Sequence, residues 1–298
     1  MRAQEWRARR RAHEERVDPW IEPRRTRRLA GDADPTDDFL FEYYPFSMGK
    51  LRTWHPGLGV VLEDAEEFLA HPFYLRVDDG VTVSPDAIGE RRPRLDLAIA
   101  ILEGTMSREP VTGCFALHEW AMVYGLEQDE VRHSSLPLRL TPTQVRETVD
   151  AIGLRCTHID AYRFFTDEAI PRNAHTPTRA TQPTMEQPGC LHASMDLYKL
   201  AMWFHPLIAS ELIADCFEIA RHARALDMRA SPYDAAVLGL ETIPIETADG
   251  RRAYAAEQRA LMSMTAPVRE RLRHALLDLR DTLTERGADR AERPISAR

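Results

Sequence analysis

Apolar residues recur along most of the chain with the spacing of α-helices, and one stretch is apolar on almost every side. This stretch, residues 190–204, begins after Gly189 and ends before Pro206. Such a pattern is typical of a helix that is packed all round rather than on one face. Three of its residues nonetheless form one polar stripe at i, i+4 and i+7, namely His192, Asp196 and Lys199. Because a buried charge is costly unless it is paired or bound, the stripe predicts a polar centre beside this helix.

The remaining pattern predicts several helices and a few short strands. Helical spacing favours helices over residues 1–17, 95–106, 141–153, 210–226, 252–264 and 267–286. Strand-like runs cover residues 58–63, 136–140, 154–165 and 243–247, and a hairpin over residues 73–83 turns at Asp79-Gly80. Because the strands are few and short, we expect an α+β fold with a small, mainly antiparallel sheet surrounded by helices.

The two ends of the chain differ in composition from its middle. Residues 1–38 begin with mixed Arg and Glu and continue through three prolines to a run of aspartates. This change predicts a basic N-terminal helical arm and linker, whose arginines either contact phosphate groups or are simply solvated. Residues 39–287 are expected to form a single main α+β domain, and residues 288–298 a flexible C-terminal tail.

Composition limits the class of protein. The chain has 298 residues, of which 44% are hydrophobic, enough for a substantial core. Its net charge of −8 argues against a general nucleic-acid coat. We expect no membrane span, because no apolar run approaches about 18 residues, and residues 1–11 lack the apolar part of a secretory signal. Four cysteines without C-x-x-C spacing favour a reduced, cytoplasmic protein.

Three apolar segments each carry a histidine with a nearby carboxylate. The pairs are His118 with Glu119, His158 with Asp160, and His192 with Asp196. In the strand expected over residues 154–165, His158 and Asp160 point the same way, because side chains alternate between the two faces of a strand. If the three segments face one cavity, all six side chains are candidate catalytic residues.

The six side chains are compatible with three kinds of centre. As ligands they suit Zn or Fe, in a hydrolase or oxygenase that acts on a small molecule. They equally suit general acid–base catalysis without a metal, each carboxylate orienting its histidine. They could also form a buried network in a non-catalytic binding protein. The zinc-protease motif H-E-x-x-H is incomplete, since Met122 stands where its second histidine belongs.

Five stretches carry a family resemblance. They are W-H-P-G at residues 54–57, G-C-F-A-L-H-E-W-A-M-V-Y at 113–124, C-T-H-I-D-A at 156–161, Q-P-G-C-L-H from residue 187 running to Lys199, and L-D-M-R-A-S-P-Y-D at 226–234. In these stretches the chain resembles an actinobacterial family commonly labelled "3-methyladenine DNA glycosylase". The resemblance covers roughly residues 38–265.

The resemblance implies a DNA-repair hydrolase that cleaves the N-glycosidic bond of an alkylated purine in damaged DNA. Such a reaction needs an activated water, a pocket for the base and a surface for phosphate groups. On this reading Asp160 or Glu119 would serve as the base. The aromatic residues of 39–54 would form the pocket, and the basic arm would contact the DNA backbone.

Six residues are further candidates for contact with a substrate. They are Arg163, Lys199, Asp227, Arg229, Tyr233 and Asp234. The three cations are expected to contact an anionic group, and the last four lie in a turn expected to follow the helix at residues 210–226. The expected partner is damaged DNA on the glycosylase reading and a small molecule on the metal reading, while the sequence specifies no oligomeric state.

Overall fold

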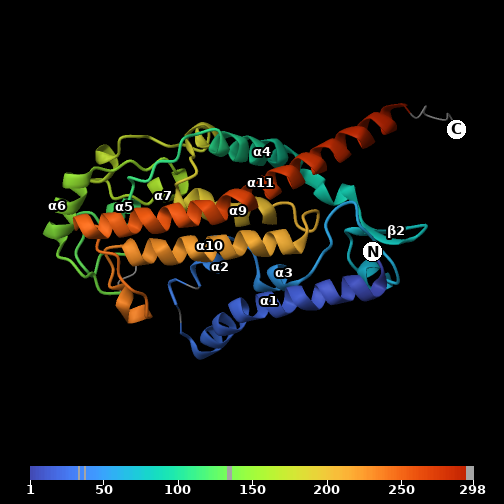
Figure 1. Cartoon of the computed structure of the whole chain (residues 1–298), viewed down its shortest axis with the longest axis horizontal. Helices are drawn as coiled ribbons and strands as arrows, with labels where there is room; N and C mark the ends of the chain where they lie inside the picture. The colour runs from blue at the N-terminus through green and yellow to red at the C-terminus, as the bar shows by residue number, and fades with distance from the viewer. Residues whose placement is uncertain (33, 37, 133–135, 293–298) are drawn as a thin grey trace.

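The computed structural model describes residues 1–32, 34–36, 38–132 and 136–292 (Figure 1). It confirms an α+β chain in which helices predominate over one small antiparallel sheet. The α-helices are α1 (Ala3–Ala30), α2 (Phe39–Tyr43), α3 (Met48–Arg52), α4 (Arg92–Met106), α5 (Leu117–Ala121), α6 (Pro142–Ile152), α7 (Ile159–Tyr162), α8 (Gln182–Met185), α9 (Leu191–Met202), α10 (Ser210–Ala230) and α11 (Ala248–Glu292). Short 3₁₀ helices span Glu66–Ala70, Pro85–Arg91, Ile170–Arg172 and Ala235–Leu238.

Helices α9, α10 and α11 pack against one another at the centre of the molecule (Figure 1). Helix α9 confirms the predicted buried helix, since every residue in it except Lys199 is buried. Helix α11 is continuous through Pro267, where two separate helices were predicted. Leu261 and Leu272 are buried on either side of this proline, and their packing offsets the backbone hydrogen bond that a proline removes.

The sheet lies towards one end of the molecule, away from α5 and α6 (Figure 1). Its strands β1 (Val61–Leu62), β2 (Tyr74–Val77) and β3 (Gly80–Val83) are antiparallel in the order β1-β3-β2. The predicted hairpin is confirmed, with Val77 paired to Gly80. Gly80 has a φ of 145°, and a Cβ there would lie 2.1 Å from the carbonyl oxygen of Leu62, so only glycine fits this close approach.

The strand predicted over residues 154–165 is wrong. Only Leu154 makes an isolated bridge, to Asn173, and the chain then forms the short helix α7. His158 is the N-cap of this helix, and its Nδ1 accepts a hydrogen bond from the backbone amide of Asp160 at 3.2 Å. A side chain that bonds its own backbone two residues ahead competes with strand pairing, and the alternation of apolar and polar residues could not reveal this bond.

Two further predicted strands, residues 136–140 and 243–247, form no strand in the structure. Leu138 makes one isolated bridge to Tyr233, and residues 243–247 are loop and turn. Ile243 and Ile245 are buried there without a strand partner. Their apolar character therefore reflects core packing, which an alternating pattern alone does not distinguish from a strand.

Helix α1 packs along the body of the protein instead of extending from it as an arm (Figure 1). Trp6, Val17 and Ile21 are fully buried in the core. On its other side, Arg16 pairs with Asp215 of α10 at 2.7 Å. The predicted helix over residues 1–17 is thus confirmed but runs on to Ala30, and two of its arginines, Arg9 and Arg16, pair with acidic residues of α10.

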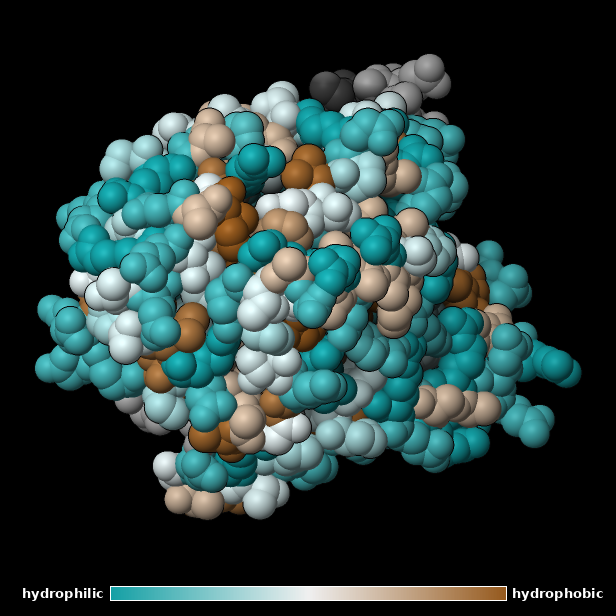
Figure 2. All heavy atoms as spheres, turned by 60° about the vertical axis from the view of Figure 1, so that its left-hand side comes forward, coloured by the Kyte–Doolittle hydropathy of each residue, from teal (hydrophilic) through white to brown (hydrophobic). Residues whose placement is uncertain are grey.

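The surface mixes polar and apolar groups. On the face shown in Figure 2, hydrophobic residues form small patches between hydrophilic ones. In the part of the chain that the structure describes, no helix combines the length and apolarity needed to cross a bilayer. The predicted tail begins within α11, whose last residue is Glu292, and residues 293–298 lie outside the described residues.

Candidate functional site

The three histidines singled out in the sequence meet in space. His118 comes from α5, His158 precedes α7, and His192 lies in the first turn of α9. The ring of His192 lies between the other two, with centroids 4.6 Å from His118 and 5.3 Å from His158. All three side chains are buried. The three imidazoles, whose convergence the sequence left open, therefore lie together.

Around His118 the structure assembles a first group of carboxylates. Nε2 of His118 lies 2.8 Å from Oδ1 of Asp227, a residue of α10. Arg224, one turn earlier in α10, donates to Oε1 of Glu119 at 2.7 Å and to Oδ2 of Asp227 at 3.2 Å. Arg224 thus orients both carboxylates and leaves Oδ1 of Asp227 facing the histidine. We call His118, Glu119 and Asp227 the first group.

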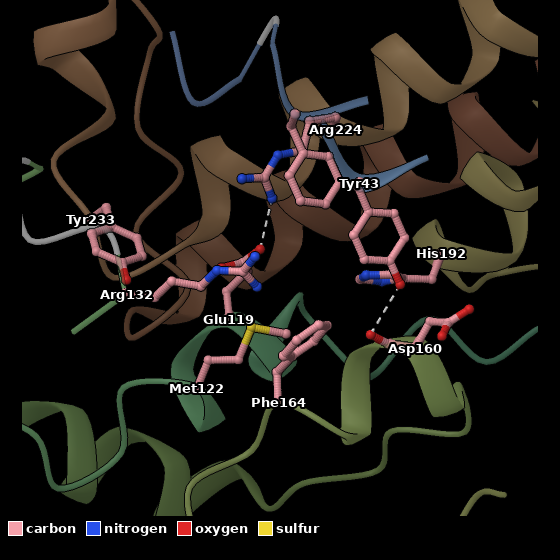
Figure 3. Close-up of a pocket in the computed structure, with 10 residues that line it drawn as sticks. Tyr43, Glu119, Met122, Arg132, Asp160, Phe164, His192, Arg224 and Tyr233 are labelled. Carbon is pink, nitrogen blue, oxygen red and sulfur yellow. Dashed lines mark hydrogen bonds and ion pairs between the residues drawn. The ribbon is translucent and has the colours of Figure 1, made fainter. Parts of the chain in front are cut away.

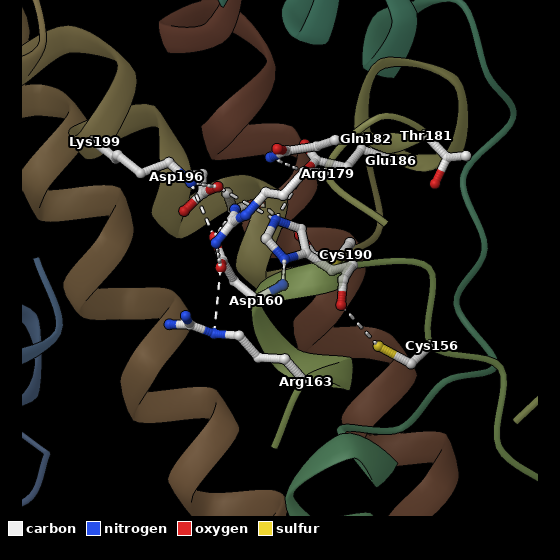
Figure 4. Close-up of polar contacts among 12 residues, drawn as sticks. Cys156, Asp160, Arg163, Arg179, Thr181, Gln182, Glu186, Cys190, Asp196 and Lys199 are labelled. Atoms are coloured by element: carbon white, nitrogen blue, oxygen red, sulfur yellow. Dashed lines mark hydrogen bonds and ion pairs between the residues drawn. The ribbon is translucent and has the colours of Figure 1, made fainter. Parts of the chain in front are cut away.

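Around His158 lies a second group of the same composition (Figure 4). Nε2 of His158 is 2.9 Å from Oε1 of Glu186 and 3.3 Å from Oδ2 of Asp196. Gln182 donates to Oε1 of Glu186 at 2.6 Å, and Tyr44 donates to Oδ1 of Asp196 at 2.8 Å. These hydrogen bonds fix the carboxylates, so that each directs one oxygen at the histidine. We call His158, Glu186 and Asp196 the second group.

The short ion-pair contacts in both groups do not have the alignment of hydrogen bonds. Nε2 of His118, Nε2 of His158 and Oδ1 of Asp227 are buried and have no hydrogen-bond partner among the described residues, and neither has Nδ1 of His192. Metal–ligand bonds of about 2.0–2.2 Å place neighbouring ligand atoms of one ion roughly 3 Å apart, off the line of an N–H donor. In each group, all three residues offer ligand atoms within 4.8 Å of one another.

The surroundings of the three histidines shift their pKa values in different directions. Burial opposes the charge on His158, but the Glu186 and Asp196 carboxylates prevail and raise its pKa to about 10. The pKa of His118 is also raised, because Asp227 outweighs its burial. His192 differs, since burial and the two neighbouring histidines hold its pKa well below the usual value. His192 is therefore neutral and has a lone pair free to bind an ion.

Two cations, the buried Arg224 and the mostly buried Lys199, balance part of the carboxylate charge. Arg224 bonds the first group, and Lys199 pairs with Asp196 of the second group and, at 3.2 Å, with Oδ2 of Asp160. Burial opposes the charge on Lys199, but Asp196 and Asp160 raise its pKa. The carboxylates also pair with His118 and His158, whose raised pKa values favour the charged form of both rings when no ion is bound. An ion that binds in either group would replace the proton on its histidine.

Asp160 lies at the edge of the second group. Burial would raise its pKa, but bonds from Arg179 and the charge on Lys199 lower it. Nη1 of Arg179 lies 2.9 Å from Oδ2, and Nε of Arg163 lies 3.5 Å from Oδ1 (Figure 4). Asp160 is thus engaged by three cations. Asp160 and His158 do not share one face of a strand, as the sequence predicted; instead the backbone amide of Asp160 donates a hydrogen bond to that histidine.

A pocket opens beside Glu119 of the first group and His192 (Figure 3). It encloses about 570 Å³, a volume that includes its mouth and open solvent. Its lining residues are Phe39, Tyr43, Glu119, Met122, Arg132, Asp160, Phe164, His192, Arg224 and Tyr233. Because Glu119 and His192 belong to this lining, a molecule in the pocket can reach the centre.

Some of the six predicted substrate contacts lie at the two groups or in the pocket, and the others lie elsewhere. Asp227 is a member of the first group, Lys199 contacts the second, and Tyr233 lines the pocket. Arg163 contacts Asp160 at 3.5 Å, and its guanidinium lies over the rings of two pocket residues, 5.8 Å from the centroid of Tyr43 and 4.5 Å from that of Phe164. The last two lie away from the pocket: Arg229 donates to the carbonyl oxygen of Glu241 at 2.9 Å, and Asp234 accepts from the amide of Ala236 at 3.1 Å.

Sequence reasoning missed Glu186, Arg224 and Arg132. Glu186 lies in the loop that precedes α9, and its place in the centre depends on how that loop folds back. Arg224 follows the buried alanines Ala220 and Ala223 on α10 and precedes Asp227 by three residues. An arginine next to the apolar stripe of this helix and three residues before an aspartate was the available signal, since a cation buried there needs a carboxylate partner.

Three cysteines lie next to the first group. Cys114, Cys156 and Cys190 line a second, narrower hollow together with His118. Burial raises the pKa of the Cys156 thiol to about 12, so this residue is a neutral thiol rather than a reactive thiolate. All four cysteines of the chain are free.

The chain was compared with protein-family models, with curated proteins and with solved structures, and none of them matched. The glycosylase family suggested by the five sequence stretches therefore stays a prediction.

Proposed function

We propose that this protein is a metal-dependent enzyme that acts on a small molecule at the buried His/carboxylate centre. One observation supports this most directly. Two histidine nitrogens lie 2.8 Å and 2.9 Å from carboxylate oxygens in buried positions, and neither nitrogen forms a hydrogen bond with the described residues. An ion between the atoms of each group would satisfy them.

The ligands of the first ion would be His118, Glu119 and Asp227, and those of the second would be His158, Glu186 and Asp196. His192 lies between the two groups with its Nδ1 unpaired, and it would complete the coordination of one of the ions. Arg224, Gln182 and Tyr44 would hold the carboxylates in place, as residues behind metal ligands commonly do.

The class of reaction depends on the ion. Zinc bound to histidine and carboxylate activates a water for hydrolysis, whereas iron bound by histidines and a carboxylate with open positions suits an oxygenase. The pocket supplies the site for the substrate, because Glu119 and His192 face it. A reduced, cytoplasmic location agrees with the four free cysteines.

Elemental analysis of the protein, purified without a chelating tag or added metal, tests this proposal. We expect about two zinc or iron ions per wild-type chain and the loss of about one of them in each of His118→Ala and His158→Ala. His222→Ala is the matched control, because His222 is an exposed histidine on α10 and should leave the metal content unchanged.

Circular dichroism would establish that the variants are folded. If the wild-type protein contains no metal and takes up none from zinc, ferrous iron or manganese, the two groups are a buried polar network and the proposal fails. Zinc as the resident ion would direct the search for substrates to hydrolysis, and iron would direct it to reactions with dioxygen.

A second candidate is the hydrolysis of an N-glycosidic bond in alkylated DNA, expected from the resemblance. The aromatic lining of the pocket supports it, since a flipped base would stack on Tyr43 or Phe164. The predicted phosphate contacts are less favourable, because Arg24 and Arg27 pair with Asp38. Release of free base from methylated DNA by the wild-type protein, and not by Glu119→Gln, would support this candidate.

A further inference from the structure

We infer that the pocket beside the centre binds a small planar molecule with a carboxylate group, which Arg132 holds while Tyr43 and Phe164 stack on its ring. The inference rests on the proposed function only for what happens at the centre. The binding of the molecule depends on the pocket alone, so that the two can be tested separately.

Flat aromatic surfaces make the pocket selective for a planar molecule. Phe39 and Tyr43 form a stacked pair, with ring centroids 5.0 Å apart and an interplanar angle of 11°. Figure 3 shows Tyr43 and Phe164 facing the same space from different elements. An aromatic ring placed between such surfaces gains stacking as well as burial of apolar area.

Arg132 supplies a cation that the protein itself does not neutralise. Within the part of the chain that the structure describes, its guanidinium contacts the Phe164 ring, 4.9 Å from the centroid, and no carboxylate pairs with it. Figure 3 shows its side chain extending towards the middle of the pocket. The other arginine of the lining, Arg224, is already bonded to Glu119 and Asp227.

The acidic residues of the lining do not exclude an anion, because they are already paired. Arg224 bonds Glu119, and Arg179 and Lys199 bond Asp160. Arg132 is therefore the pocket cation left for a ligand, and a planar guanidinium binds a carboxylate through two parallel hydrogen bonds. A molecule held in this way would direct the rest of its structure towards His192 and Glu119.

Calorimetric titration with 2-naphthoate tests this inference on the protein as purified, and 2-naphthamide serves as the neutral ligand of the same shape. We expect naphthoate to bind the wild-type protein more tightly than naphthamide does. Arg132→Gln should raise the Kd for naphthoate at least about tenfold, the loss expected for one charge-assisted pair, and should leave the Kd for naphthamide nearly unchanged.

Two further variants separate the charge from the stacking. Phe164→Leu should weaken both ligands, because it removes the flat surface and keeps the charge. Arg155→Gln should weaken neither, since Arg155 is an exposed arginine that lines the neighbouring cysteine hollow.

Equal affinity of naphthoate for the wild-type protein and Arg132→Gln would overturn the inference. Preference for the uncharged base 3-methyladenine over naphthoate would overturn it as well, in favour of the glycosylase reading. Metal analysis of the same samples separates the two proposals. Metal without naphthoate binding removes this inference alone, whereas naphthoate binding without metal supports the pocket and removes the proposed function.

Discussion

Nε2 of His118 and Oδ1 of Asp227 lie 2.8 Å apart in the interior of the protein, and neither atom has a hydrogen-bond partner among the described residues. The two residues come from α5 and α10. The other carboxylate oxygen of Asp227 accepts a bond from Arg224, so the direction of Oδ1 is set by the protein rather than by the histidine.

Asp227→Asn is expected to weaken metal binding at the first group. The amide keeps the shape of the side chain but loses the charge that binds the ion, and we expect the affinity to fall by about 10–100-fold or more. A competitive titration of the metal-free protein with a chromophoric chelator measures this change. Asp278→Asn, on the exposed side of α11, is the control and should bind metal as the wild-type protein does. Unchanged affinity in Asp227→Asn would exclude this carboxylate as a ligand.

Arg224→Met is expected to destabilise the fold when no metal is bound. The change leaves Glu119 and Asp227 buried without the cation that bonds them, and removing one partner of a buried ion pair costs about 3–5 kcal/mol. Urea unfolding of the metal-free protein measures the loss. Zinc should restore part of it, because an ion replaces the missing charge. Arg259→Met, on the exposed face of α11, should change little, and a loss of the same size there would remove the explanation.

The free energy of unfolding is expected to decrease as the pH falls from about 6.5 towards 4. Burial and the neighbouring His205 lower the pKa of His55 to about 3, and burial and Lys50 lower that of His205 to about 4. These residues stay neutral in the fold while they gain protons in the unfolded chain below about 6.5. The contribution of each histidine to the free energy of unfolding is therefore complete above that pH. It decreases as the pH falls, by up to roughly 1.4 kcal/mol per pH unit.

His55→Asn isolates one of these two contributions. Nδ1 of His55 lies 2.7 Å from the Tyr74 hydroxyl, and an asparagine amide can take its place without a titratable group. Between pH 6 and pH 4 we expect the slope of unfolding free energy against pH to be smaller by about 1.4 kcal/mol per pH unit than in the wild-type protein. Urea unfolding at several pH values measures both slopes, and identical slopes would show that His55 is not held neutral.

Trp6→Ala is expected to destabilise the whole protein. The Trp6 ring is fully buried, with its centroid 6.5 Å from that of Trp54 and 5.4 Å from that of Phe68. Removing such a side chain costs about 3–5 kcal/mol. Leu29→Ala in the same helix is the control, because Leu29 is 86% exposed. A small effect of Trp6→Ala in thermal unfolding would show that α1 is indeed a separable arm.

The sequence allowed the centre to be located but not completed. A histidine within an apolar segment can be recognised from the sequence as a candidate site residue, because a buried polar group needs a partner. This reasoning found His118, His158 and His192. It could not find Glu186, since the residue lies in a loop whose path depends on the whole fold. Asp227 was assigned to a turn, whereas α10 continues to Ala230 and brings it into the first group.

In the fold as well, elements that local sequence signals determine could be predicted, whereas elements that depend on distant segments could not. The helix at α6 begins with Thr141 and Pro142 and ends at Gly153, all local signals, and the structure confirms both ends. The segment before α7 has an alternating pattern but no neighbouring strand to pair with. Pairing is a property of two segments, so the alternation around His158 could not by itself establish a strand.

Lys199 is one of only two lysines in the chain. Its side chain is 12% exposed and is held by Asp160 and Asp196, whereas Lys50 on α3 is exposed. Reagents that acylate amines should therefore modify Lys50 and leave the centre intact, with the half-buried amino terminus as a slower site. A fluorophore or a surface tether can thus be attached mainly at Lys50 without any mutation. Peptide mass spectrometry would identify the labelled residue.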